Sequence, residues 1–165
     1  MRKVNAIAVA LLLMPSAAWG AGNTTTISGT SRAEVVDTIT ITHVNGQALK
    51  FGKFTVDVPG TVTVPITGPV VRTGGVSTVP GANTASTDRF IVNGLRNRAV
   101  LISTSSGVVT FGTHSMTFTT TRSVTNGVLS NGGSLSVSVG GTLSVGANQH
   151  DGIYTGTYTA TASYN

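Results

Sequence analysis

The chain has 165 residues, contains no cysteine and carries a formal net charge of +5, from 10 basic against 5 acidic residues. The absence of cysteine excludes disulfide scaffolds, thiol catalysis and every metal site that uses a thiolate. Charged residues make up only 9% of the chain, whereas about a quarter is typical of soluble proteins. The polar surface must therefore consist mainly of Thr, Ser, Asn and Gly, which suits an exported structural β protein better than an enzyme with an acid–base site.

The basic residues are scattered along the chain and carry no signature of nucleic-acid binding. Their only cluster is the LRNR of Leu95 to Arg98. A nucleic-acid-binding surface usually presents a basic stripe interleaved with aromatic side chains, and the sequence shows neither feature. We therefore expect no nucleic-acid partner.

The N-terminus has the pattern of a secretory signal peptide. Arg2 and Lys3 form a basic start, Ala6 to Met14 form an apolar run, and Ala18-Trp19-Gly20 supplies the small residues that a signal peptidase reads. A membrane helix is the alternative, but the apolar run is about half of the roughly 20 residues needed to span a bilayer. We expect cleavage after this small-residue site, so that the mature chain begins at Ala21.

The sequence predicts two parts, a signal peptide over residues 1–20 and a single mature domain over residues 21–165. Removing Arg2 and Lys3 from the 10 basic residues leaves 8 against 5 acidic ones, a net charge of +3. The mature length is enough to bury a core but too short for two ordinary domains. No later segment is apolar enough to span a membrane, so we expect an exported protein, in the periplasm, at the cell surface or outside the cell.

The mature chain shows the period-two alternation of β-strands and almost no helix signal. β-branched residues dominate the alternating runs, and apolar residues do not recur at the three–four spacing of a helix. Gly, Pro, Asn and Asp punctuate the runs at short intervals. The stretches expected to hold strands are 35–44, 49–58, 61–66, 89–94, 99–104, 108–111, 114–121, 134–145 and 152–164.

Turn signals separate these stretches, and residues 67–88 are expected to include a long loop. Many short strands at this spacing predict an all-β fold, in the form of an immunoglobulin-like, pilin-like antiparallel β-sandwich with no helix longer than a turn. A threonine-rich solenoid is rejected because the Thr pairs follow no fixed repeat length. The turn signals are Asn45-Gly46, Pro59-Gly60, Pro80-Gly81, Asn126-Gly127, Asn131-Gly132-Gly133 and Gly140-Gly141.

Candidate catalytic and metal-binding residues lie far apart in the sequence. None of His43, His114 and His150 has a ligand partner at i+2 or i+4. His150-Asp151 is the only adjacent pair of a histidine and a carboxylate, and it reads as part of a turn. No general acid–base pair, nucleophile motif or nucleotide-binding motif is visible. We expect no catalytic residue, metal or cofactor, although folding could still assemble a site from distant residues.

The last stretch, DGIYTGTYTATASYN, alternates most regularly. One face contains all three tyrosines and should be buried, while the other contains Thr and Ser and should meet water. We single it out as a core strand and a candidate assembly strand, because a free backbone edge can pair with another chain. The residues of its inward face are Gly152, Tyr154, Gly156, Tyr158, Ala160, Ala162 and Tyr164.

Four motifs resemble the bacterial family called domain of unknown function 4402. They are LKFGKFTV at 49–56, FIVNG at 90–94, MTF at 116–118 and GGTLSVGANQHDGIYTGTYTATASYN at 140–165. Members are short exported β proteins with a Leu-x-Phe-Gly element near the start and a Gln-x-x-Gly-x-Tyr-x-Gly-x-Tyr type of tail. The family has no settled activity, so the resemblance implies a fold more than a function.

The tail is also similar to those of chaperone–usher pilins and spore-coat-U-like pilins. Those proteins end in an alternating strand, with a Gly about fourteen positions from the end and a penultimate Tyr. Gly152 and Tyr164 match that pattern. The resemblance implies an incomplete sandwich, completed first by a periplasmic chaperone and then by the N-terminal extension of a like subunit, with an usher as a further partner. Two features differ from pilins: the N-terminal residues offer Ile27 and little else apolar before Ala33, and the cysteine pair of many pilins is missing.

These observations leave three functions in order of preference. The first is a non-enzymatic exported structural or surface protein, with a pilin-like subunit assembled by β-strand complementation as its specific form. The second is a self-complete secreted β-sandwich that binds a ligand or a carbohydrate. The third is a hydrolase on a β scaffold. Whether the backbone edge of the last strand is completed within the chain separates the first function from the second.

Overall fold

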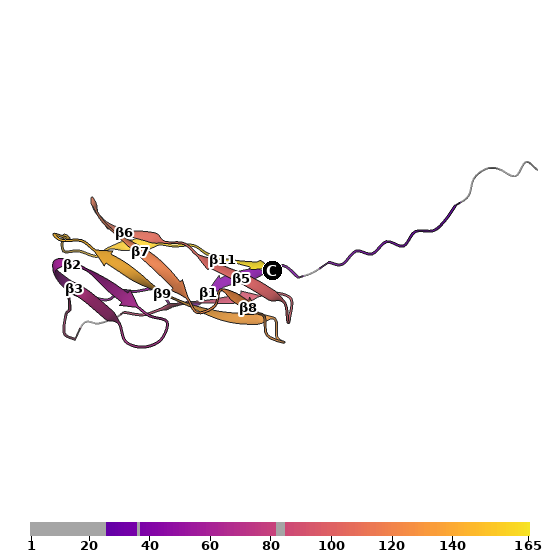
Figure 1. Cartoon of the computed structure of the whole chain (residues 1–165), viewed down its shortest axis with the longest axis horizontal. Coiled ribbons are helices and arrows are strands. Elements are labelled where there is room, and N and C mark those ends of the chain that lie inside the picture. The colour runs from indigo at the N-terminus through magenta and orange to yellow at the C-terminus, as the bar shows by residue number, and fades with distance from the viewer. Residues whose placement is uncertain (1–25, 36, 82–84) are drawn as a thin grey trace, which may run out of the picture. The chain divides into compact units, whose positions relative to one another are not determined.

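The computed structural model describes residues 26–35, 37–81 and 85–165. The chain divides into two compact units, Met1–Glu34 and Val35–Asn165. In the first unit the described residues are all exposed and form neither helix nor strand. The second unit carries all the strands of the described chain and, over its described residues, no helix (Figure 1). The predicted signal peptide and its cleavage site lie outside the described residues.

Over its described residues, the second unit contains eleven β-strands. Runs of Val, Ile, Thr and Phe form them because β-branched and aromatic side chains pack well on a pleated surface. The strands are β1 (Thr40–His43), β2 (Phe54–Val64), β3 (Val71–Thr78), β4 (Asp88–Asn93), β5 (Ala99–Thr104), β6 (Gly107–Phe111), β7 (His114–Arg122), β8 (Asn126–Val128), β9 (Ser134–Val145), β10 (Thr155–Thr157) and β11 (Ala160–Tyr164).

The larger sheet has eight strands, in the order β1-β4-β9-β7-β6-β10, with β2 paired to β9 and β3 paired to β2. β9 is its central strand: β4 and then β2 pair along one edge, and β7 pairs along the other. Gly140 and Gly141 lie where the partner changes from β4 to β2. A Cβ on either glycine would collide with a backbone oxygen, of Val64 or of Thr119. Only glycine allows the strands to approach so closely at this point.

The smaller sheet has three antiparallel strands in the order β11-β5-β8. Its strands gather beside the marked C-terminus in Figure 1. Every ladder in both sheets is antiparallel. The predicted all-β class with antiparallel, sandwich-like sheets is therefore confirmed.

The apolar core consists of two clusters that differ in how they are enclosed. The first cluster takes its buried members from β2, β3, β7 and β9, which all belong to the larger sheet. The second cluster combines members from both sheets. The first cluster is Val62, Val76, Met116, Phe118, Leu143 and Val145. The second cluster is Val92, Val100, Ile102, Leu129, Val137 and Val139.

The predicted turn at Pro59-Gly60 is wrong, because these residues lie inside β2. The pairing of β2 with β3 shifts register between Val56 and Gly60. Gly74 on β3 has a φ of 64°, and a Cβ on Gly60 would collide with the carbonyl oxygen of Thr73. The glycines therefore permit a bulge and a close strand approach where the sequence pattern indicates a chain reversal.

Two further turn predictions are also wrong, and one strand, β3, was not predicted. Asn126-Gly127 begins β8, and Gly140-Gly141 lies within β9. Residues 67–88 contain β3, whose alternation is interrupted by Gly74-Gly75. Tertiary pairing with β2 makes this weak stretch a strand, and local propensity alone does not reveal it.

Leu129 belongs to the second cluster and is 1% exposed, so truncating its side chain should cause a large loss of stability. Leu129→Ala should lower the free energy of unfolding by about 2–5 kcal/mol, because it removes apolar contacts and leaves a cavity. Leu101→Ala is the matched control, since Leu101 is 42% exposed and should cost less than about half as much. Denaturant unfolding of the purified chain measures both, and equal losses would contradict the assignment of Leu129 to the core.

Candidate functional site

The terminal stretch forms two short strands that belong to different sheets. β10 pairs with β6 in the larger sheet, and β11 pairs with β5 in the smaller one. At the junction the Ser105 N–H donates to the Thr159 carbonyl, and the Thr159 N–H donates to the Ser105 side chain, both at 2.9 Å. The tail thus runs antiparallel to the continuous stretch from β5 to β6. Within the described chain, neither β10 nor β11 forms a ladder on its other edge.

The side chains of the tail lie on two faces. Its tyrosines and alanines are half-buried, whereas the Thr and Ser residues between them are exposed. Gly152 and Gly156 are exposed, and each lies where a side chain would not fit. A Cβ on Gly156 would collide with the Val108 carbonyl of the paired strand, and one on Gly152 would collide with the Phe111 ring. The half-buried members are Tyr154, Tyr158, Ala160, Ala162 and Tyr164.

Tyr164 fastens the C-terminus to two other segments. Its hydroxyl accepts the Leu95 N–H at 2.7 Å and donates to the Asp37 carbonyl at 3.0 Å. Its ring packs against the second cluster, and a Cβ on Gly94 would collide with its hydroxyl. Tyr164 therefore links the last strand to the segments that contain Leu95 and Asp37. No local pattern in the sequence indicates these partners.

Tyr158 belongs to a polar corner, defined by Asp88, His43 and Tyr158, in which Asp88 is buried, Tyr158 is half-buried and His43 is exposed. Tyr158 donates to Asp88 Oδ2 at 2.8 Å, and His43 Nε2 lies 2.6 Å from Asp88 Oδ1. The Arg89 N–H also donates to Oδ1, at 2.7 Å. Desolvation by burial, followed by the hydrogen bond to Asp88 and its negative charge, raises the pKa of the Tyr158 phenol. This phenol therefore stays a hydrogen-bond donor at neutral pH.

The structure also brings histidines together that the sequence separates. His43 pairs with Asp88 across 45 residues, a histidine–carboxylate contact that adjacency in the sequence does not show. The His114 and His150 rings stack with centroids 5.2 Å apart. Sequence spacing could not reveal either contact, because both depend on strand pairing. Over the described residues, no group of three His, Asp or Glu side chains is placed to hold a metal ion.

An open groove of about 1160 Å³ lies beside β10. Residues 48–56 and residues 149–158 contribute to its lining. Val109, Met116, Phe118 and Leu143 also line it, so the groove opens onto the first apolar cluster. Its volume exceeds the roughly 300–1,000 Å³ that is usual for small-molecule pockets.

The groove is mainly apolar and contains the polar corner. Six aromatic rings contribute to its lining, and all of them except the buried Phe118 are half-buried. Asp88 is 5% exposed and is the buried charged residue of the described chain. Lys50 and Lys53 also contribute to the lining. The aromatic residues in the lining are Phe51, Phe54, Phe90, Phe118, Tyr154 and Tyr158.

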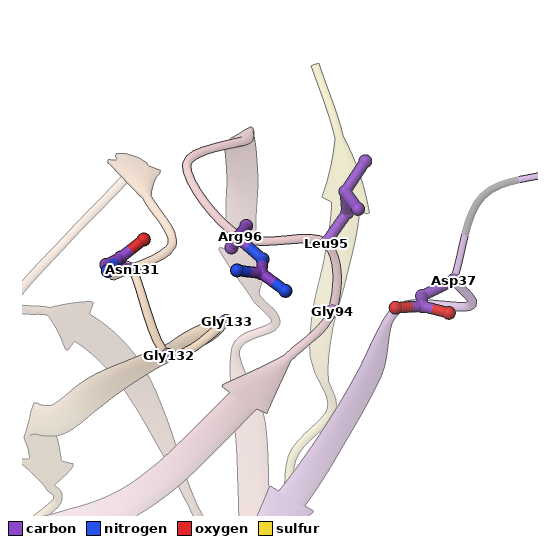
Figure 2. Close-up of a pocket in the computed structure, with 7 residues that line it drawn as sticks. All are labelled: Asp37, Gly94, Leu95, Arg96, Asn131, Gly132 and Gly133. Atoms are coloured by element: carbon purple, nitrogen blue, oxygen red, sulfur yellow. The ribbon is translucent and has the colours of Figure 1, made fainter.

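A second, polar hollow of about 320 Å³ lies beside the Tyr164 hydroxyl. Figure 2 shows the Arg96 side chain extending between the turn at Asn131 and Asp37, while Leu95 points away. Arg96 and Asp37 are exposed, so solvent screens their charges. We assign no ligand to this hollow. Its lining residues are Asp37, Gly94, Leu95, Arg96, Asn131, Gly132 and Gly133.

Comparison with known proteins identifies one family. The family model described as Domain of unknown function (DUF4402) matches residues 39–164. No curated protein and no solved structure matches the chain. Among the described residues there is no helix with the length and apolar character needed to cross a membrane.

The contacts of Tyr164 predict a measurable loss when its hydroxyl is removed. Tyr164→Phe leaves the Leu95 N–H and the Asp37 carbonyl without this partner and should lower the free energy of unfolding by about 1–3 kcal/mol. Tyr154→Phe is the control, because its hydroxyl contacts the side chain of Gln149 and the carbonyl of His150 in an exposed turn. Thermal or denaturant unfolding measures both losses of stability. A larger loss in the control would contradict the stabilising role of the Tyr164 hydroxyl.

The raised pKa of Tyr158 predicts how stability depends on pH. The folded chain keeps a phenolic proton that the unfolded chain loses above its ordinary pKa of about 10. The stabilisation is therefore complete below about pH 10 and decreases as the pH rises further. Tyr158→Phe should remove this part of the decrease, whereas the exposed neighbouring change Thr159→Ala should keep it. Denaturant unfolding from about pH 8 to pH 11 tests this. If the free energy of unfolding depends on pH equally in wild type and in Tyr158→Phe, the prediction is refuted.

Proposed function

This chain belongs to the DUF4402 family, and we propose that it is an exported, non-enzymatic structural or surface protein. Its specific form in this proposal is a pilin-like subunit whose fold is completed by a β-strand from another chain. The partners would be like subunits, with a periplasmic chaperone and an usher during assembly. The signal-peptide pattern and the low content of charged residues support the exported location.

One observation carries the proposal: the groove opens onto a core cluster whose buried members all come from one sheet. Beside it, β10 has no ladder on its outer edge within the described chain. An added strand could supply main-chain hydrogen bonds to that edge and place alternate side chains in the groove. Such an addition would cover apolar surface and remove an edge that invites aggregation.

The polar corner supports a structural role better than a catalytic one. The Asp88 carboxylate is occupied by Tyr158, His43 and the Arg89 N–H. No serine or threonine hydroxyl forms a hydrogen bond to His43 among the described contacts, so the corner lacks the nucleophile–base pair of an acyl-transfer enzyme. A charged group held in this way orients neighbouring strands.

A second candidate is a self-complete sandwich that binds an apolar ligand. The groove favours it in one respect, since a mostly apolar cavity with a few convergent polar groups is the usual form of a ligand site. The two candidates differ in what covers the groove. Strand complementation requires another polypeptide and makes assembly depend on protein concentration.

The test uses Ile153, which lines the groove and is 82% exposed. Ile153→Asp should weaken self-association at least about 10-fold, because a charge would be desolvated at the covered edge. Val128→Asp is the matched control, since Val128 is 60% exposed on β8 and does not line the groove. Sedimentation velocity over a range of protein concentrations measures association, and circular dichroism checks the fold. A wild-type chain that stays monomeric, or equal effects of both variants, would contradict strand complementation.

A further inference from the structure

Asp88 places a buried negative charge in the wall of an apolar groove. The residue is 5% exposed, and it lines the groove beside Phe90 and Tyr158. Removing a carboxylate from water is costly, so a buried charge is usually paired with an opposite one. Among the described residues, the one basic side chain in ion-pair contact with Asp88 is His43, which is charged only when protonated. Where His43 is neutral, the described chain gives this carboxylate no cationic partner.

The Asp88 carboxylate also has room for one more hydrogen-bond donor. Its two oxygens can accept about four hydrogen bonds in total. The described chain supplies three. Oδ1 accepts the Arg89 N–H and lies 2.6 Å from His43 Nε2, and Oδ2 accepts the Tyr158 hydroxyl. The remaining position is therefore on Oδ2, next to Tyr158, and both residues line the groove.

Four aromatic rings lie in a row on this side of the groove. The centroid of the Tyr158 ring is 6.1 Å from that of Phe90 and 6.2 Å from that of Phe118, and both pairs are nearly perpendicular. Phe51 continues the row, with its centroid 5.7 Å from that of Phe118. Aromatic faces attract a cation that lies within about 6 Å of the ring centroid. A carboxylate beside such rings favours a cation over a neutral group or an anion.

Two lysines in the lining favour the opposite charge. Lys50 and Lys53 are both exposed, and neither forms an ion pair with Asp88. Their charges lie in water, where salt screens them over about 10 Å. They act on a ligand more weakly than a desolvated carboxylate does. An anion held by these lysines is nevertheless the competing ligand that an experiment must exclude.

We infer that the polar corner binds a small primary amine in its protonated form. The ammonium group donates to Asp88 Oδ2, and the apolar body of the amine lies against the aromatic rings and the rest of the apolar lining. A primary ammonium supplies both the charge and the N–H donors, whereas a neutral hydroxyl supplies no charge. The groove, of about 1160 Å³, has room for such a molecule.

The inference goes beyond the proposed function and does not depend on it. Amine binding uses side chains of the groove, whereas strand complementation uses the outer backbone edge of β10. A strand placed in the groove would cover the polar corner. The amine site therefore belongs to the free chain, whose groove holds no added strand.

The test compares three probes of similar shape on the purified full chain. Phenylethylamine is a cation at neutral pH, phenylethanol is neutral and phenylpropionate is an anion. Isothermal titration calorimetry should show that phenylethylamine binds at least about 10-fold more tightly than phenylethanol, because a hydrogen bond to a charged group is the stronger one. Phenylpropionate should bind most weakly of the three.

Two carboxylates in the lining provide a matched pair of variants. Asp88→Asn keeps the shape of the side chain and removes its charge, so it should weaken phenylethylamine binding at least about 10-fold. Phenylethanol binding should change by less than about 3-fold in this variant, since the alcohol carries no charge. Asp151→Asn is the control, because Asp151 also lines the groove but is fully exposed. Its effect on phenylethylamine should stay within about 2-fold.

Tyr158→Phe separates the charge of Asp88 from its structural role. Like Asp88→Asn, it disrupts the hydrogen bond between Tyr158 and Asp88. It keeps the carboxylate, however, and frees a second position on Oδ2. Tyr158→Phe should therefore retain or tighten phenylethylamine binding, and circular dichroism checks that each variant folds. A loss as large as that in Asp88→Asn would show that only the structure of the corner matters and would overturn the inference.

Three other results would also overturn it. Equal binding of phenylethylamine and phenylethanol would exclude recognition of the charge, and tighter binding of phenylpropionate would assign the head group to the lysines. No phenylethylamine binding at about 10 mM would show that water suffices for the free position. Each of these results leaves the proposed function standing, because that is measured by the effect of Ile153→Asp on self-association. A chain that stays monomeric contradicts strand complementation and leaves the amine site intact.

Discussion

The constraint on which the rest of this structure depends is that a single sheet supplies every buried member of the first apolar cluster. Its buried members come from four strands of one sheet, and half-buried rings continue it into an open groove. Apolar surface left in contact with water is unfavourable in proportion to its area. The second cluster does not leave apolar surface in contact with water in this way, because it combines members from both sheets.

The terminal strands connect the groove to the well-packed part of the domain. β11 and the Tyr164 hydroxyl hold the C-terminus against the second cluster. β10 lies beside the first cluster and pairs only with β6 in the described chain. Tyr158 stands at the junction and is bonded to Asp88. The tail is thus firmly held at its end, while it presents a backbone edge nearer its start.

Much of the fold could be predicted from local pattern, and the errors have a common cause. The alternation at 134–145 and at 99–104 corresponds to β9 and β5, because half-buried strands require period two. Pro59-Gly60 and Gly140-Gly141 read as turns, yet they lie within strands. Glycine serves both in turns and where two backbones approach closely, and only the packed neighbours distinguish these uses.

The sequence by itself determined the all-β class, the family and the alternating faces of the tail, because side-chain periodicity and composition are local properties. Only the tertiary structure decided that the tail is divided between two sheets and that His43, Asp88 and Tyr158 meet. It also decided that the first cluster opens into a groove. These features depend on strand order and register, which bring together residues separated by 45 to 70 positions. Local pattern carries no such distances.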